Sequence, residues 1–206
     1  MPPLPDPNAV FLNIPYDEEF SRLYVAYIVG LTQLSLVPHL TTEIPGGDRR
    51  LSKIFKLIQS CRYSIHDLSR VEVGAAPTDV PRFNMPLELG MAVTWQSLHP
   101  GRHTWFVWES EPYRLQRSAS DLNGTDVNIH HGTPEGVLAE LRNALGRDHP
   151  PSVPQMQTVY DLVNSALNSI FLRNGTSNLY DRSVFLDLCS LSVSLGAFFP
   201  ASKLAV

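Results

Sequence analysis

The chain has 206 residues, of which 43% are hydrophobic and 17% are charged, and its formal net charge is −4. This composition is typical of a globular protein that buries a core, and the weak negative charge argues against a broad nucleic-acid-binding surface. The two cysteines, Cys61 and Cys189, form no metal-ligand spacing, so we expect a reduced, cytoplasmic protein without a metal site. We also expect no signal peptide and no membrane span, because segment 183–199 is short and contains Asp187 and four serines.

Apolar runs alternate with amphipathic segments along the first two thirds of the chain. The run 9–14, which Pro15 ends, predicts a buried parallel strand, and a helix opens near Asp17. Pro38 predicts that the second strand, 36–40, lies at a sheet edge, because proline cannot donate to a ladder. The further expected elements are a helix capped by Asp48, a strand at 63–66, a helix at 85–96, strands at 102–108 and 127–130, and a helix from 133 to 145.

Strand and helix alternate five times before the proline-rich linker 148–154, which predicts an α/β domain with a parallel sheet. We divide the chain into this α/β domain, residues 1–148, and a helical tail, residues 155–206. The tail is expected to form two helices with long apolar faces. Such faces must cover the α/β domain or a second copy of the chain, and we expect a homodimer contact.

Polar residues follow two of the expected strands and open one helix. In a parallel sheet of order 2-1-3-4-5, these positions meet at the carboxyl edge, where the strand order reverses and ligands bind. Carboxylates, arginine and an aromatic side chain at one edge indicate a polar ligand with a sugar or a phosphate. The candidate site residues are Asn13, Asp17, Asp67, Ser69, Arg82, Phe83, Asn84 and Glu88.

Several of these candidates also have a purely structural interpretation. Asp17 could stabilise the start of a helix, and Asn84 could cap the next one. Asp67 could hold its own loop through backbone amides, or it could pair with Arg82. These alternatives stay open at the level of the sequence.

Glu88 is the strongest candidate for a functional role. It could stabilise a helix dipole from the first turn, but Leu87 and Leu89 flank it, so we expect partial desolvation and a raised pKa. His130-His131 near Asp126 lacks a metal-ligand arrangement and is interpreted as a pair at a strand end. Gly46-Gly47 with Arg49-Arg50 could contact a phosphate, although a plain turn explains the glycines.

Three segments carry a resemblance to known proteins: VFLNIPYD at 10–17, YSIHDLSR at 63–70 and PRFNMPLELG at 81–90. Together they resemble a bacterial group that is similar to the nucleoside 2-deoxyribosyltransferases and, more distantly, to Toll/interleukin-1-receptor-like (TIR) domains. The resemblance spans roughly residues 9–145. It implies a flavodoxin-like three-layer fold, with a five-stranded parallel sheet in the order 2-1-3-4-5, and a nucleoside or nucleotide ligand.

The resemblance also implies roles for two carboxylates. In the deoxyribosyltransferases a glutamate attacks the anomeric carbon of the sugar, and in TIR enzymes a glutamate supports cleavage of the nicotinamide bond of NAD; Glu88 matches both. Asp67 matches an aspartate that holds the sugar or the base. The implied activity is that of an N-glycosidase-like hydrolase or transferase, with NAD as the favoured substrate and no required cofactor. A non-catalytic nucleotide-sensing module and a scaffold with a dead site are the alternatives.

Overall fold

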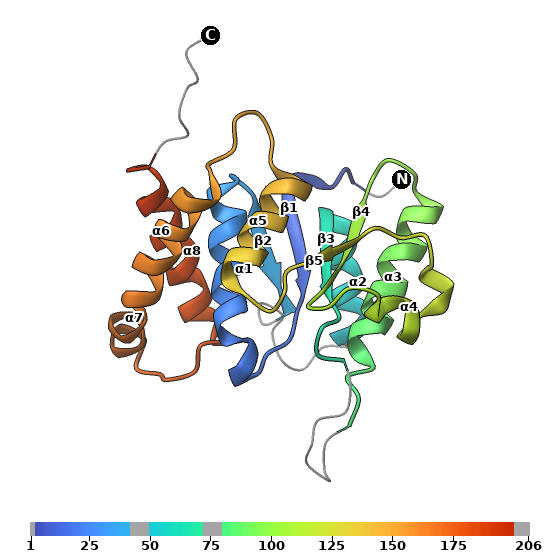
Figure 1. The fold of residues 1–206 in the computed structure, drawn as a ribbon, viewed down its shortest axis with the longest axis horizontal. Helices are drawn as coiled ribbons and strands as arrows, with labels where there is room; N and C mark the ends of the chain where they lie inside the picture. Colours follow the sequence, from blue (N-terminus) through green and yellow to red (C-terminus); the bar gives the residue numbers. More distant parts are fainter. Residues whose placement is uncertain (1–2, 42–49, 72–79, 200–206) are drawn as a thin grey trace. The chain divides into compact units, whose positions relative to one another are not determined.

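The computed structural model describes residues 3–41, 50–71 and 80–199 (Figure 1). Gly46-Gly47, the expected cap Asp48 and Arg49 lie outside the described residues. The chain forms two compact units, of which the first comprises Met1–Pro15 with Pro38–His131, and the second comprises Tyr16–Val37 with Gly132–Val206. The functional division into residues 1–148 and 155–206 stays a prediction.

The first unit contains a five-stranded sheet in the order β2-β1-β3-β4-β5, which confirms the predicted α/β class and flavodoxin-like strand order (Figure 1). The pairs β1–β3, β3–β4 and β4–β5 are parallel. Pro38 lies on the edge strand, as expected. The strands are β1 (Asp6–Asn13), β2 (Val37–Leu40), β3 (Cys61–Asp67), β4 (Thr104–Glu109) and β5 (Val127–Ile129).

Two apolar clusters hold helices to this sheet. The helices are α2 (Arg50–Ser60), α3 (Asn84–Leu98) and the short α4 (Arg114–Ser118), with a 3₁₀ turn η3 at Ser120–Leu122. Side chains of β1, α2 and α3, among them Phe11, Ile58 and Trp95, form the first cluster. The second cluster packs Met85 and Leu89 of α3 against β4 and α4. Burial of such side chains stabilises the fold by about 1.5–3 kcal/mol each.

The second unit is helical. A 3₁₀ turn, η1 (Glu18–Phe20), leads into α1 (Ser21–Gln33), which packs against α5 (Pro134–Leu145), α6 (Val153–Ser165) and α8 (Arg182–Gly196). At Gly30 of α1, a Cβ atom would lie 2.3 Å from Leu141 Cδ1 of α5, so glycine permits this close approach. The expected start of α5 is confirmed, since the Thr133 side chain accepts a hydrogen bond from Gly136 N.

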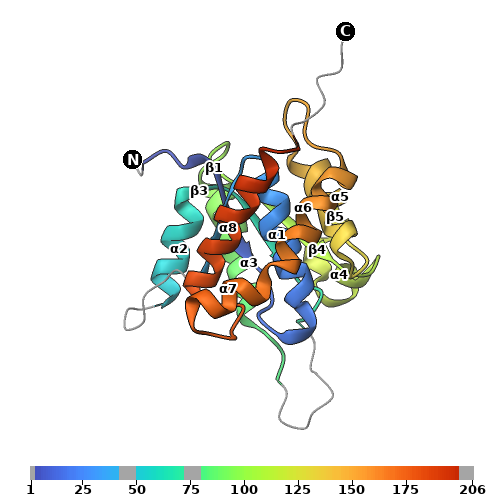
Figure 2. The same ribbon diagram turned by 90° about the vertical axis from the view of Figure 1, so that its left-hand side faces the viewer.

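Up to residue 199, where the described part of the tail ends, the tail contains three helices, so the expectation of two was wrong. The helical pattern breaks at Ala166, whose ψ of −6° departs from the helical value, and α7 (Leu167–Asn174) begins in a new direction before Gly175 ends it (Figure 2). The tail packs against α1 of its own unit. The hydroxyl oxygens of Ser192 in α8 and Thr32 in α1 are hydrogen bonded at 2.7 Å, and the backbone oxygen of Ser192 accepts from Gln33 Nε2 at 2.7 Å.

Not all of the apolar surface of the tail is covered by its own chain. Several large apolar side chains there remain exposed, namely Leu162, Leu172, Leu186, Val193 and Phe198. The homodimer contact therefore stays a prediction. None of the helices in residues 3–41, 50–71 and 80–199 combines the length and the apolar character that crossing a bilayer requires.

Candidate functional site at the carboxyl edge of the sheet

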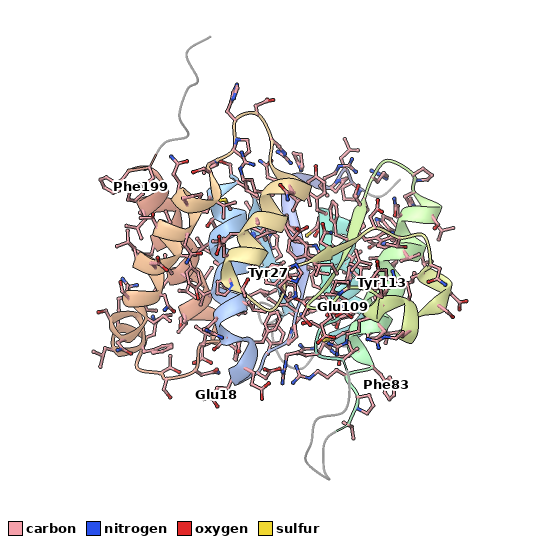
Figure 3. The ribbon with its side chains drawn as sticks, in the orientation of Figure 1. Glu18, Tyr27, Phe83, Glu109, Tyr113 and Phe199 are labelled. Atoms are coloured by element: carbon pink, nitrogen blue, oxygen red, sulfur yellow. The ribbon has the colours of Figure 1, made fainter. Side chains whose placement is uncertain are left out.

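Each of the five strands ends at, or is followed by, a buried polar residue. These residues are Thr41 after β2, Asn13 in β1, Asp67 in β3, Glu109 in β4 and His130 after β5. Because the carboxyl ends of parallel strands meet at one edge, the five residues lie along that edge. Figure 3 labels one of them, Glu109. Buried polar groups cost free energy unless they are hydrogen bonded, so the partners of each residue matter.

Asn13 links two strands to α3. Its amide Nδ2 donates to the backbone oxygen of Met85 at 2.9 Å and lies 3.0 Å from His66 Nδ1. The residue is only 4% exposed. Asn13 thus fastens the first turn of α3 to the ends of β1 and β3, which is a structural task that the sequence did not indicate.

Asp67 is fully buried and interacts with residues on both of its carboxylate oxygens. Oδ1 accepts from the backbone N–H of Ser69 at 3.0 Å, and Oδ2 lies 3.2 Å from His130 Nε2. Burial tends to raise the pKa of Asp67, but hydrogen bonding and charge attraction from His130, with hydrogen bonds from Ser69, outweigh it and lower the pKa. Asp67 is therefore an ionised acceptor at neutral pH, and it holds its loop as the structural interpretation supposed.

Glu109 is a buried carboxylate that the sequence reasoning missed. Its Oε2 accepts from Ser110 N at 3.3 Å and lies 3.9 Å from Arg114 Nε of α4. Its Oε1 is buried and has no hydrogen-bond partner among the described residues. Burial raises its pKa to about 7, Arg114 opposes that shift, and the charge of Asp67 adds to it. The signal in the sequence is an acidic residue that closes an apolar strand.

Glu88 lies in the second turn of α3 and is 5% exposed. The first-turn placement was wrong, so stabilisation of the helix dipole does not explain this residue. Its Oε2 is buried and has no hydrogen-bond partner within the described part of the chain. Burial raises the pKa of Glu88 to about 7, while the charge of Arg50 and a hydrogen bond from the Asn84 side chain act to lower it. The expected desolvation is confirmed.

The surroundings of Glu88 include one exposed cation. Arg50 begins the described part of α2, and its Nη2 donates to Thr41 Oγ1 at 3.0 Å. The sequence suggested that Asn84 caps α3, but Phe83 occupies the N-cap position. Instead, Asn84 is the first helical residue and hydrogen bonds to Glu88 one turn later.

The remaining candidates divide between the two units. Asp17 belongs to the second unit, where its side chain accepts from Phe20 N at 3.0 Å and caps η1. In the first unit Ser69 is buried and Arg82 is half-buried, and the backbone N–H of Arg82 donates a hydrogen bond to Val71 O. Phe83 is 74% exposed and projects outward (Figure 3). That these residues serve one ligand stays a prediction.

The structure and the comparisons give no further pointer to the chemistry. Within residues 3–41, 50–71 and 80–199, no three His, Cys, Asp or Glu side chains are grouped as metal ligands. The sequence matches no protein-family model, and the search of curated proteins found no match.

Proposed function

We propose that the carboxyl edge of the sheet binds a nucleoside or nucleotide and that Glu88 promotes cleavage of its N-glycosidic bond, with NAD as the favoured substrate. The observation that carries this proposal is the burial of the Glu88 carboxylate. Glu88 combines a buried carboxylate, an oxygen without a hydrogen-bond partner among the described residues, and a pKa raised to about 7. A carboxylate that is costly to bury is typical of a site where charge stabilisation is needed.

The proposed reaction breaks the bond between the anomeric carbon and the base nitrogen. The bonding electron pair leaves with the base, and positive charge develops on the sugar. Ionised Glu88 either stabilises this charge or bonds to the anomeric carbon. In a hydrolase, water oxygen then bonds to that carbon, any bond to Glu88 breaks with its electron pair returning to the carboxylate, and the water releases one proton. In a transferase, a nitrogen of a second base takes the place of the water oxygen. Burial strengthens the electrostatic part of this effect.

Other residues take supporting roles in the proposal. Asp67 would accept a hydrogen bond from a sugar hydroxyl and would not donate a proton, because its pKa is lowered and it is ionised. Arg82 supplies a cation for phosphate, and exposed Phe83 supplies a face for a base. Ser69 and Asn84 complete the proposed substrate-binding set within the first unit.

The direct test is to incubate the full chain with NAD and with a panel of nucleosides, and to identify the products by mass spectrometry. Wild type, Glu88→Gln and Thr94→Ala are compared. Thr94 is a matched control on α3, since its side chain is exposed and donates a hydrogen bond back to Gly90 O. Release of free base by wild type and Thr94→Ala, but not by Glu88→Gln, is expected.

A nucleotide-sensing module is the second candidate. It is favoured by the internal hydrogen bonds of Asn13 and Asp67, which already occupy donors and acceptors that a substrate would need. A sensor binds the nucleotide without releasing products, whereas a scaffold with a dead site neither binds nor cleaves it. Calorimetry with NAD beside the mass assay distinguishes the three.

The pH dependence of turnover is expected to report Glu88. The active form is the ionised carboxylate, and its pKa is raised to about 7, so kcat/KM should rise through pH 7 and level off above pH 8. Initial rates of base release between pH 5 and 9 check this. A rate that is constant across this range would contradict the assignment of Glu88 as the ionised group.

We propose further that the exposed apolar side chains of the tail mediate a homodimer in a cytoplasmic protein. Light scattering of the full-length chain is expected to give twice the 23.0 kDa mass of one copy. Phe198→Ser, at a side chain that is 77% exposed, should shift the population toward monomer. A clean monomer at high concentration would contradict the dimer.

A further inference from the structure

We infer that Asn13, His66, Ser64 and His103 form one hydrogen-bond chain of fixed direction that positions the start of α3, and with it Glu88. The inference deepens the proposed function and rests on it only where turnover is concerned. Asn13 and His66 are positioning residues, since they act on Glu88 through the backbone of α3.

The chain is continuous and buried. From Asn13 Nδ2 it runs to His66 Nδ1 at 3.0 Å, from His66 Nε2 to Ser64 Oγ at 2.9 Å, and from that oxygen to His103 Nε2 at 2.9 Å. His103 Nδ1 ends it on the backbone oxygen of Cys61 at 2.9 Å. The four side chains belong to residues that are at most 4% exposed. Water therefore does not compete for these bonds.

The direction of every bond follows from its two ends. The Met85 carbonyl can only accept, so the Asn13 atom facing it is the amide nitrogen, and the same nitrogen donates to His66 Nδ1. His66 must then carry its proton on Nε2 and donate to Ser64. At the other end the Cys61 carbonyl accepts from His103 Nδ1–H, so His103 Nε2 accepts from the Ser64 hydroxyl.

Both imidazoles are suited to this arrangement because they are neutral. Burial, and then the proximity of His103, lower the pKa of His66 to about 3. Burial also lowers the pKa of His103, partly opposed by its bond to Cys61 O. A proton added to His66 Nδ1 would face the N–H of Asn13, donor against donor. The chain therefore keeps one pattern of donors and acceptors across neutral pH.

The link to Glu88 is the carbonyl of Met85. Met85 and Glu88 lie three residues apart, so they share one side of α3, and Met85 and Leu89 are 1% and 3% exposed. Asn13 fastens this turn to the ends of β1 and β3. The chain thereby maintains the burial that is the main cause of the raised pKa of Glu88.

Nitrogen NMR of the wild-type histidines tests the direction without any variant. The expected result is a Nε2–H tautomer for His66 that is unchanged between pH 8 and pH 5, and a Nδ1–H tautomer for His103 at pH 8. The opposite tautomer at either residue, or titration of His66 near pH 6.5, would overturn the inference.

The positioning role is tested by the pKa of Glu88, read from its carboxyl carbon by NMR in wild type, Asn13→Ala and Thr94→Ala. In wild type and Thr94→Ala a pKa near 7 is expected, whereas Asn13→Ala should lower it toward 4.5 by at least about one unit. A merely structural Asn13 would lower stability and leave this pKa unchanged, which would overturn the role. The readout needs no turnover, so its failure is distinct from failure of the proposed reaction.

Discussion

Glu88→Gln is expected to abolish base release from NAD while it increases the stability of the fold at pH 8. Glutamine keeps the shape of the side chain but removes the negative charge that offsets the charge on the sugar. Loss of such an electrostatic group costs roughly 100-fold or more in rate. The stability of the fold should increase, because Glu88 Oε2 is a buried acceptor without a hydrogen-bond partner among the described residues.

The sign of the stability change follows from the raised pKa. Folding moves the pKa of Glu88 from 4.5 to about 7, so the favourable contribution of the protonated form is complete below 4.5 and is lost as the pH rises through 7. Above pH 7 the folded protein holds a charge that the glutamine variant lacks. We expect Glu88→Gln to gain about 1–3 kcal/mol at pH 8 and much less at pH 5.

Urea unfolding at the two pH values measures this difference, and Glu111→Gln is the control, since Glu111 is exposed on the same unit. A glutamine variant that turns over NAD at the wild-type rate would show that Glu88 is structural. A variant that loses stability at pH 8 would show that the carboxylate has a favourable partner in the folded protein.

Asp67→Asn is expected to destabilise the protein by roughly 1–3 kcal/mol at pH 7, because it leaves the buried hydrogen-bonding partners of the carboxylate imperfectly satisfied. The carboxylate of Asp67 accepts from Ser69 N on one oxygen and lies 3.2 Å from His130 Nε2 on the other. An asparagine offers one oxygen and one NH₂ group. The NH₂ group of the asparagine must then face either Ser69 N or His130 Nε2, each of which now lies beside a carboxylate oxygen.

The pKa of Asp67 is lowered in the folded state, so its contribution is present above 3.8 and is lost as the pH falls through the folded pKa. The gap between wild type and Asp67→Asn should therefore be wider at pH 7 than at pH 3. Unfolding in urea measures both, with Asp121→Asn, at an exposed position, as the control. Equal stability of wild type and variant at pH 7 would contradict a stabilising role for the pair with His130.

Local signals in the sequence determined the elements and the fold class. The apolar run ending at Pro15, the edge position of Pro38 and the Thr133-Pro134 helix start each depend on residues that are adjacent in the chain. The burial of Glu88 could be expected only in part from its neighbours, since Leu89 is buried beside it but Leu87 is exposed. Signals of this kind act within one turn or one strand, so they can be read without knowing which strands are neighbours.

Only the tertiary structure decided which polar groups interact. Asp67 and His130 are 63 positions apart, and Asn13 and Met85 are 72 apart, so no local pattern could pair them. The sheet brings these residues together because the ends of β1, β3, β4 and β5 share one edge. Burial then forces each polar atom to find a partner or to shift its pKa, and so Glu109 and Glu88 have pKa values near 7 while Asp67 stays ionised.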